Sequence, residues 1–259
     1  MPQFSTQRFY DELAERYHLV YPDWEASVAR QGRALHDIME RALGPGPRTI
    51  LDCACGIGTQ SLGLAALGHR VAGSDLSAVA VTRAAREARG RPAPLAGVTA
   101  DMRALPFGME VFDVVVCADN SLPHLLTHDD LDAALAGMHR VLRPGGLLAV
   151  STRDYDADRQ AKPRWRPPLV TGTPGGRAIT FHLWHWHDDG ERYDMELFQL
   201  VPDPEADGES WSVQVVRATY WALTRDQVAG HVAGAGFRDL RWLTPAESGF
   251  FQPVLLARR

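Results

Sequence analysis

Lysine is almost absent from this chain: Lys162 is the only one in 259 residues, so nearly every basic side chain is arginine. We attribute this bias to the base composition of the genome. Positive charge is not in excess either, because 27 lysines and arginines stand against 32 aspartates and glutamates, for a formal net charge of −5. Proteins dedicated to nucleic acid usually present a basic surface. The composition therefore predicts no nucleic-acid partner.

Long apolar runs and cysteines are also scarce. No stretch approaches the roughly 18–20 apolar residues of a membrane helix, and the first residues carry acids where a secretory signal has its apolar run. The three cysteines, Cys53, Cys55 and Cys117, lack the spacing of a disulfide framework. With 45% hydrophobic residues, the chain has enough apolar side chains for a core. These features predict a cytoplasmic globular protein with reduced, buried thiols and no membrane partner.

The apolar spacing of the first 153 residues is typical of an α/β protein. Residues 8–43 have helical spacing and predict two helices joined near residues 21–24. Further along, short apolar runs alternate with helical patterns, and this repetition predicts a doubly wound, mostly parallel sheet. The predicted strands are 49–55, 70–74, 95–100, 112–118 and 147–152, and the predicted helices are 59–67, 77–89 and 129–142.

After residue 153 the pattern changes. A segment rich in proline, arginine and glycine (about 156–177) predicts a loop, and three strand-like stretches follow at 178–186, 192–201 and 212–221. A helix at 224–235 and strands at 236–243 and 250–257 complete the prediction. We therefore expect an α/β fold with three parts: an N-terminal helical lid (1–43), a core (44–153 and 224–259) and an inserted antiparallel β cap (154–223).

The most informative segment runs from Leu51 to Gly58, where a buried strand leads into small residues and then a helix. In such a place an α/β sheet brings its backbone close to a nucleotide-like ligand. A dinucleotide needs three spaced glycines, and counting from Gly56 the third position is Ser61. The incomplete fingerprint favours a ligand without a pyrophosphate and leaves an NAD-dependent oxidoreductase as a minor alternative.

Acidic residues also follow the next two predicted strands. Asp75 stands where a carboxylate can accept hydrogen bonds from both hydroxyls of a ribose, in NAD or in S-adenosylmethionine (SAM). Asp101 is placed to accept a hydrogen bond from the amino group of an adenine, with Met102 beside the ring. Together with Asp52, these acids at three consecutive strand ends predict a nucleoside site.

In this order and spacing, the motifs resemble those of class I SAM-dependent methyltransferases. They are Leu-Asp-x-Ala-Cys-Gly-x-Gly (51–58), Ser-Asp-Leu-Ser (74–77), Ala-Asp-Met (100–102) and Leu-Arg-Pro-Gly-Gly (142–146). Within that class, the chain especially resembles the glycine N-methyltransferase and glycine/sarcosine N-methyltransferase group. That likeness rests on Ala54, on Asn-Ser-x-x-His-Leu at 120–125 and on Arg-x-Tyr-Asp at 153–156. It implies a Rossmann-like core, SAM as cofactor and S-adenosylhomocysteine as product.

The resemblance also implies which residues contact SAM. The expected contacts are Ala54 and Gly56 at the methionine end, Asp75 and Leu76 at the ribose, Asp101 and Met102 at the adenine, and Ala118. In the N-terminal region, Arg30 matches an arginine that meets the SAM carboxylate, with an exposed helix arginine as the alternative. Tyr21 lies near the aromatic residues of the family's lid.

The candidate acceptor site lies at the same edge of the sheet. Arg153, after the fifth strand, can hold a carboxylate with two parallel hydrogen bonds; an ion pair with a nearby aspartate is the alternative. Asn120 is placed to orient the acceptor, and His124 to act as a hydrogen-bond partner, a weak base or a helix cap, so these two are the candidate catalytic residues. Tyr155 and Trp184 are candidate pocket residues, with ordinary packing as the alternative.

SAM brings an activated methyl group, and an amine needs only to be neutral when it attacks, so a dedicated base is not required, whereas a hydroxyl acceptor would need one. The sequence leaves open whether a base is used. No metal is predicted, because His182, His185 and His187 have no carboxylate or cysteine partner at ligand spacing. We predict methyl transfer from SAM to a small-molecule acceptor, with an amine nitrogen of an amino-acid-like substrate as the first choice. The alternatives are O-, N- or C-methylation of a larger aromatic or natural-product scaffold, the NAD-dependent oxidoreductase, and a SAM-binding protein without turnover. The sequence leaves open whether the chain forms a homo-oligomer.

Overall fold

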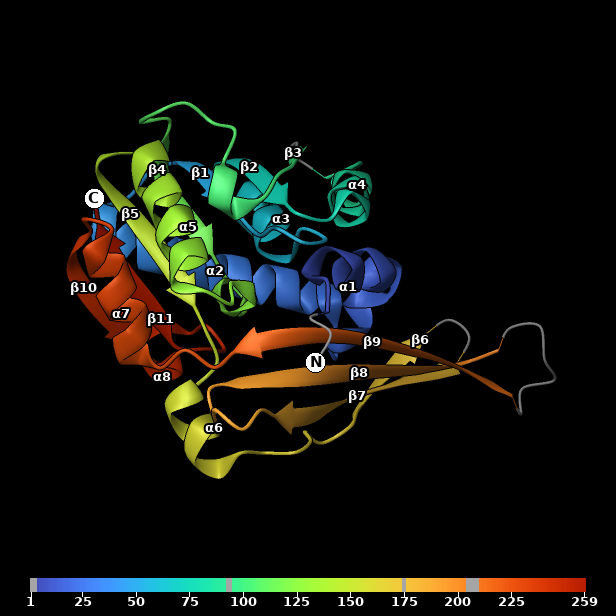
Figure 1. Cartoon of the computed structure of the whole chain (residues 1–259). Coiled ribbons are helices and arrows are strands. Elements are labelled where there is room, and N and C mark those ends of the chain that lie inside the picture. Colours follow the sequence, from blue (N-terminus) through green and yellow to red (C-terminus); the bar gives the residue numbers. More distant parts are fainter. Residues whose placement is uncertain (1–3, 92–94, 174–175, 204–209) are drawn as a thin grey trace.

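Two sheets organise the chain, one mostly parallel and one antiparallel (Figure 1). The structure is a computed structural model that describes residues 4–91, 95–173, 176–203 and 210–259. The larger sheet has seven strands in the order β10-β11-β5-β4-β1-β2-β3. These are β1 (Thr49–Asp52), β2 (Arg70–Asp75), β3 (Ala96–Thr99), β4 (Phe112–Cys117), β5 (Leu142–Ser151), β10 (Arg238–Leu243) and β11 (Val254–Arg258).

The order of these strands positions the site. Strands β1 to β5 pair in parallel, and β11 runs antiparallel to both β5 and β10. The chain passes from β1 to β2 and β3 on one side, then returns to place β4 and β5 on the other side of β1. Open α/β sheets bind ligands at the carboxyl ends of their strands, where such a reversal occurs. The predicted α/β fold is confirmed, and the crevice lies between β1 and β4.

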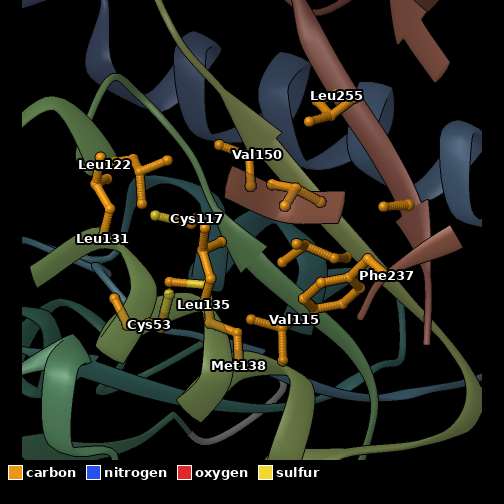
Figure 2. Close-up of a cluster of buried hydrophobic side chains, with 14 of the residues drawn as sticks. Cys53, Val115, Cys117, Leu122, Leu131, Leu135, Met138, Val150, Phe237 and Leu255 are labelled. Carbon is orange, nitrogen blue, oxygen red and sulfur yellow. The ribbon is translucent and has the colours of Figure 1, made fainter. Parts of the chain in front are cut away.

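Helices cover both faces of the large sheet. One face packs against α5 (His128–Val141) and α7 (Arg225–Gly234), and the other against α2 (Trp24–Leu43), α3 (Thr59–Ala66) and α4 (Ala78–Glu87). Because side chains alternate along a strand, β4 contributes to both apolar clusters. Figure 2 shows the cluster under α5, which includes Cys53, Val115, Cys117, Leu131, Leu135 and Met138. All three cysteines are free and buried.

The N-terminal segment lies between the two sheets (Figure 1). It consists of α1 (Thr6–Leu13), the 3-10 helix η1 (Ala14–Val20) and α2, and the break predicted near residues 21–24 is present. Asp23 caps α2 by accepting a hydrogen bond from the Ala26 amide. Helix α2 then crosses α3 at two glycines: a Cβ atom on Gly63 would lie 2.3 Å from the Val28 carbonyl oxygen. Only residues without a side chain permit this close approach.

The smaller sheet is antiparallel, in the order β6-β7-β8-β9. Its strands are β6 (Leu169–Thr173), β7 (Gly176–Trp186), β8 (Arg192–Pro202) and β9 (Trp211–Trp221). The sequence predicted only three of them. Strand β6 and helix α6 (Tyr155–Ala161) fall in the segment expected to be a loop, of which residues 174 and 175 lie outside the described ranges. Strand β6 exists because it pairs with β7 and not because of its own pattern.

Three short helices complete the fold: η2 (Met102–Ala104), η3 (Leu122–His124) and α8 (Pro245–Ser248). The first two lie at strand ends of the large sheet, beside the crevice. Within the described ranges, none of the helices is both long enough and apolar enough to cross a membrane.

Candidate active site

The loop after β1 turns sharply because of its glycines. Gly56 and Gly58 have φ angles of +52° and +95°, a region that side-chain-bearing residues rarely adopt. The Gly56 amide donates a hydrogen bond of 2.8 Å to Asp75 Oδ2 at the end of β2. Ser61, at the position where a dinucleotide fingerprint has its third glycine, donates a 2.7 Å hydrogen bond to Asp52 Oδ2. The turn is therefore held by hydrogen bonds to two carboxylates, which a pyrophosphate-binding loop does not require.

This loop forms one wall of a cavity of about 490 Å³, the first cavity. Its other walls come from the ends of β2 and β3, from η3 and from the N-terminal segment. Seven of the nine residues expected to contact SAM line it: Tyr21, Ala54, Gly56, Asp75, Leu76, Asp101 and Met102. The structure thus brings together residues that are up to about 80 positions apart along the chain.

The two acids of the first cavity have different surroundings. Asp75 accepts hydrogen bonds from two backbone amides, of Gly56 (2.8 Å) and Ser77 (2.9 Å), while burial raises the pKa of its carboxyl. Both of its oxygens keep a free lone pair for a ribose hydroxyl. Asp101 instead pairs with Arg103 at 2.6 Å, and the hydrogen bonds from Arg103 lower the pKa of Asp101. A ligand at Asp101 shares the carboxylate with that guanidinium.

A second cavity of about 730 Å³ lies between the N-terminal segment, the end of β5 and the antiparallel sheet. Asn120 and Arg153, both expected at the acceptor site, line it. The Arg153 guanidinium lies 4.9 Å from the centre of the Trp184 ring, on a cation–π contact. Among the described residues it has no carboxylate within ion-pair distance, because Asp154 and Asp156 pair with Arg225 instead. The Arg153 guanidinium therefore faces this cavity without a carboxylate partner among the described residues.

The remaining acceptor candidates form the base of this arrangement. Asn120 Oδ1 accepts a hydrogen bond from the Arg153 amide (3.1 Å), and its Nδ2 donates to the Tyr155 hydroxyl (2.9 Å), which in turn contacts the Tyr193 hydroxyl. Tyr155 and Trp184 are each 1% exposed and line neither cavity. Tyr155 and Trp184 lie beneath Asn120 and Arg153 and hold these two residues, which line the second cavity, in place.

Two of the expected SAM contacts lie elsewhere. Arg30 lines the second cavity, and its Nη2 donates to Ser27 Oγ at 3.1 Å. Ala118 is buried directly before the crevice and lines neither cavity. For Arg30, the N-terminal segment decides the placement: α2 starts at Trp24 and carries Arg30 past the first cavity to the second.

Four residues line both cavities: Tyr10, Tyr17, Tyr21 and Asp119. We refer to them as the shared wall. The Tyr21 hydroxyl donates a 2.7 Å hydrogen bond to Asp119 Oδ2. The sequence predicted only Tyr21 here, although Asp119 comes two residues after β4 and Asp75 is the last residue of β2, so a similar strand-end signal was present. Tyr10 and Tyr17 carried no signal, because aromatic residues at helical spacing are usually core.

His124, a candidate catalytic residue, lines the first cavity in contact with the shared wall. Its Nε2 lies 2.8 Å from the Tyr10 hydroxyl, and its ring packs 4.2 Å from the ring of Tyr220. Burial, with a smaller effect of the Arg153 charge, lowers the pKa of His124 to about 3. At neutral pH the imidazole is therefore uncharged and holds a hydrogen bond with the N-terminal segment.

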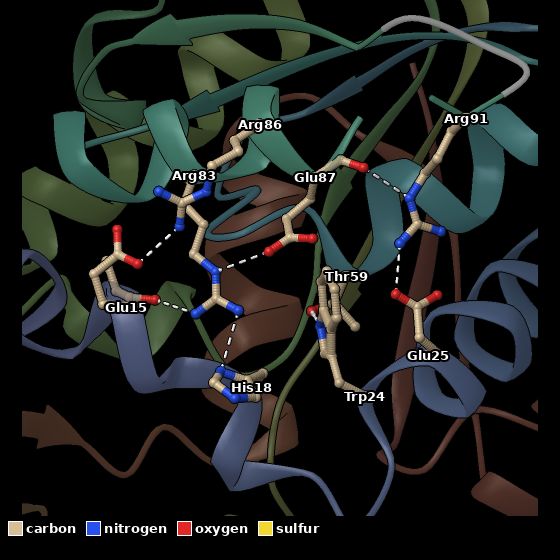
Figure 3. A network of polar contacts seen from close by, with 10 residues as sticks. Glu15, His18, Trp24, Glu25, Thr59, Arg83, Arg86, Glu87 and Arg91 are labelled. Carbon is tan, nitrogen blue, oxygen red and sulfur yellow. Dashed lines mark hydrogen bonds and ion pairs between the residues drawn. The ribbon is translucent and has the colours of Figure 1, made fainter. Parts of the chain in front are cut away.

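The N-terminal segment is also fixed to α4 (Figure 3). Arg83 donates to the Ala14 carbonyl oxygen at 2.6 Å and contacts His18 Nδ1 at 3.1 Å. Arg86 and Arg91 pair with Glu15 and Glu25, respectively, at 2.7 and 2.6 Å. These contacts hold the tyrosines of the shared wall over the crevice. Within the part of the chain that the structure describes, no cluster of three or more histidine, cysteine or acidic side chains has the geometry of a metal site.

Comparisons with known proteins agree with this geometry. Residues 50–146 match a family model described as a methyltransferase domain. A glycine/sarcosine N-methyltransferase from Parasynechococcus marenigrum (strain WH8102) is 34% identical over 152 residues, 58% of this chain and 52% of that protein. The chain thus spans about half the length of the glycine/sarcosine N-methyltransferases that it matches.

A second relative matches over more of its length. The dTDP-3-amino-3,6-dideoxy-alpha-D-glucopyranose N,N-dimethyltransferase of Streptomyces fradiae is 31% identical over 202 residues, 75% of this chain and 72% of that protein. Among solved structures, the SAM-bound amino pentose methyltransferase CalS10 from Micromonospora echinaspora has a TM-score of 0.74 at 20% identity, covering 100% of this chain and 99% of that one. At this identity the likeness concerns the fold.

Proposed function

The chain belongs to the class I SAM-dependent methyltransferase family, and on that premise we propose that it methylates an amine nitrogen of a small acceptor that carries an anionic group, such as an amino acid. The family's methyl donor is SAM, which supplies a methyl group already activated on a sulfonium. The protein's own residues bind the two reactants, exclude water and align the nucleophile.

In this proposal the adenosyl part of SAM occupies the first cavity. Asp75 supports the placement because two backbone amides hold its carboxylate while both oxygens retain lone pairs. The N-terminal segment acts as the lid over both cavities, and the antiparallel sheet acts as the cap that closes the second. The methyl group passes at the shared wall, since only there do the two cavities have common walls.

The unpaired guanidinium of Arg153 carries the proposal for the acceptor. Burying a charge without an ion-pair partner costs free energy, so we infer that an anionic group of the acceptor pairs with the Arg153 guanidinium. The Trp184 ring beneath the guanidinium and the Asn120 carbonyl on the Arg153 amide hold the fork in place. An arginine fork binds a carboxylate or phosphate with two parallel hydrogen bonds.

A second candidate is an amine on a larger scaffold, such as a nucleotide-linked amino sugar. The observation that favours it is the size of the second cavity, about 730 Å³, which lies in the range of sites for drug-sized ligands. The relative from Streptomyces fradiae is named for such a sugar. Both candidate acceptors carry an amine and an anionic group, and they differ in the distance between these two groups.

A panel of acceptors tests the proposal and separates the candidates. The purified protein is incubated with SAM and one of glycine, sarcosine, dTDP-3-amino-3,6-dideoxy-alpha-D-glucopyranose or a catechol, and S-adenosylhomocysteine and the mass of the product are measured. N-methylation of glycine or sarcosine supports the first candidate, and N-methylation of the sugar alone supports the second. Turnover of the catechol alone, or no turnover with binding of NADH in place of SAM, overturns the proposal.

A further inference from the structure

Asp119 has an unusual backbone for a residue with a side chain. It lies two residues after the end of β4 and has φ +56°, and Asn120 follows with φ +66°, so two consecutive non-glycine residues adopt the left-handed conformation. Such conformations cost energy and persist where the surrounding structure enforces them, often at functional sites. Here the turn places Asp119 in the shared wall and Asn120 in the second cavity alone.

A closed set of hydrogen bonds fixes the Asp119 carboxylate. Its amide donates to Ser151 Oγ (2.8 Å), Ser151 Oγ donates to Gln252 Oε1 (2.9 Å), and Gln252 Nε2 donates to Asp119 Oδ1 (3.4 Å). The other oxygen, Oδ2, accepts from the Tyr21 hydroxyl at 2.7 Å. None of these donors is a cation, and no arginine among the described residues lies within ion-pair distance of Asp119. Burial raises the pKa of the Asp119 carboxyl, and the charge of Arg153, which lies beyond ion-pair distance, lowers it only in part. The carboxylate is thus held in position without an ion-pair partner among the described residues.

We propose that Asp119 is the group that binds the acceptor nitrogen as its ammonium ion and takes up its proton. This inference rests on the proposed function, because it requires an amine acceptor. Arg153 lines only the second cavity, whereas Asp119 lines both. A zwitterionic acceptor therefore binds in one direction, with its anion on Arg153 and its nitrogen at the shared wall, next to the methyl donor.

The step balances in protons and electrons. An N–H proton passes from the ammonium to the Asp119 carboxylate and leaves a lone pair on nitrogen. The nitrogen forms a bond to the methyl carbon as the carbon–sulfur bond breaks, and the electron pair of that bond remains on sulfur as the thioether. Positive charge moves from sulfur to nitrogen, toward Asp119. The protonated carboxyl then releases its proton to water in the second cavity, and the ionised carboxylate stabilises the methylated ammonium.

The Asp119→Asn variant tests this role with little change of structure. Asparagine has the same size, tolerates the left-handed backbone and keeps an oxygen that accepts from the Tyr21 hydroxyl. Its Nδ2 then faces Gln252 Nε2, so the 3.4 Å hydrogen bond from Gln252 is lost. Tyr21→Phe is the matched comparison, since it removes the hydrogen bond to Asp119 Oδ2 and leaves the charge of Asp119. If Asp119 serves the acceptor, Asp119→Asn lowers kcat/KM by about 100-fold, Tyr21→Phe lowers it less, and the affinity for S-adenosylhomocysteine stays within about threefold in Asp119→Asn.

The pH profile supplies a readout that a structural role would not change. The deficit of Asp119→Asn is expected to shrink as pH rises from about 7 toward 10, because the free alkylamine then arrives already neutral. The charged and titratable side chains facing Asp119 from the lid, β5 and β9 are Tyr10, Tyr17, Tyr21, Arg153 and Tyr220. Burial raises the pKa of each phenol, and arginine stays charged, so none of them changes charge in this range.

The assay uses the full chain and whichever amine of the panel the wild-type protein methylates. Equal activity of Asp119→Asn and wild type, an equal loss in both variants, or a deficit that does not change with pH overturns the role of Asp119 and leaves the proposed function intact. If the wild-type protein methylates no amine in the panel, the proposed function fails and the role of Asp119 fails with it.

Discussion

The two cavities are built in different ways. The first is formed by short stretches at the ends of neighbouring parallel strands, at residues 53–57, 75–76 and 100–103. Backbone amides in these stretches donate the hydrogen bonds that hold the Asp75 carboxylate. The second is formed by single side chains from distant segments, such as Arg30, Asn120, Arg153 and Tyr220. A site built from contiguous stretches at strand ends can be recognised in the sequence as a motif. A site built from single side chains of distant segments leaves no such motif. Four predictions, each with its own variants or change of pH, test how far the effects on one cavity are independent of the other.

The largest effect is expected in the first cavity. Asp75→Ala removes an acceptor that can serve two ribose hydroxyls, which weakens binding by about 3 kcal/mol, or about 100-fold. Calorimetry with S-adenosylhomocysteine measures the change. Asp101→Asn is the comparison variant and is expected to have a smaller effect, because Arg103 already occupies that carboxylate. Unchanged affinity in Asp75→Ala would remove this residue from the ribose site.

The N-terminal segment, which lines both cavities, is attached to α4. The Arg83 side chain is 6% exposed and donates to the Ala14 carbonyl oxygen, so Arg83→Met is expected to lower the free energy of unfolding by about 2 kcal/mol. Arg86 also reaches the N-terminal segment, but its side chain is 52% exposed, and Arg86→Ala is expected to lower the free energy of unfolding less than Arg83→Met does. Urea unfolding of the two variants measures the difference. Equal losses would show that burial does not decide the strength of these contacts.

The second cavity is tested separately by Arg153. Arg153→Ala is expected to raise KM for an anionic acceptor by about 30-fold, corresponding to about 2 kcal/mol, because the charge-assisted hydrogen bonds are lost. Arg153→Lys keeps the charge without the fork and is expected to recover part of the affinity. The affinity for S-adenosylhomocysteine is the control and should not change. A wild-type KM in Arg153→Ala would exclude the carboxylate clamp.

The smallest effect concerns one histidine in each cavity. Burial lowers the pKa of His124 in the first cavity and of His182 in the second to about 3, below the value of about 6.5 in an unfolded chain. Stability from these neutral histidines is complete above about pH 6.5 and is lost as pH falls toward 3, because the unfolded chain binds the proton first. At pH 5 each neutral histidine lowers the free energy of unfolding by at most about 2 kcal/mol, because the unfolded pKa lies about 1.5 units above that pH.

Urea midpoints at pH 7 and pH 5 measure this loss. His182→Gln and His124→Asn each remove one titrating group, so each variant is expected to lose less stability between the two pH values than the wild-type protein does. If the pH dependence is the same in all three proteins, the histidines are already accessible to solvent in the folded state. A reduction in only one variant would show which cavity is the better protected.

Particular residues show how far the sequence predicts the site. Asp75 and Gly56 were predictable because the glycine is needed for a positive φ and the acid for a strand end, both of which are local properties. Asp119 has the same kind of signal, but its role in the shared wall depends on Tyr21, 98 positions away. Tyr155 and Trp184 were candidate pocket residues with ordinary packing as the alternative, and the structure buries both, each at 1% exposure, outside the lining of either cavity. Strand β6 was missed because its pattern is weak and its partner β7 defines it.

By itself, the sequence determined the parallel core and the edge where SAM is expected to bind, because strand period, glycine conformation and strand-end acids act within a few residues. Only the tertiary structure decided that Arg153 has no carboxylate within ion-pair distance in the described part of the chain, that Arg30 lines the second cavity and that Asp119 lines both cavities. Burial and charge compensation depend on neighbours in space, and the neighbours here come from the N-terminal segment, the seven-stranded sheet and the antiparallel sheet.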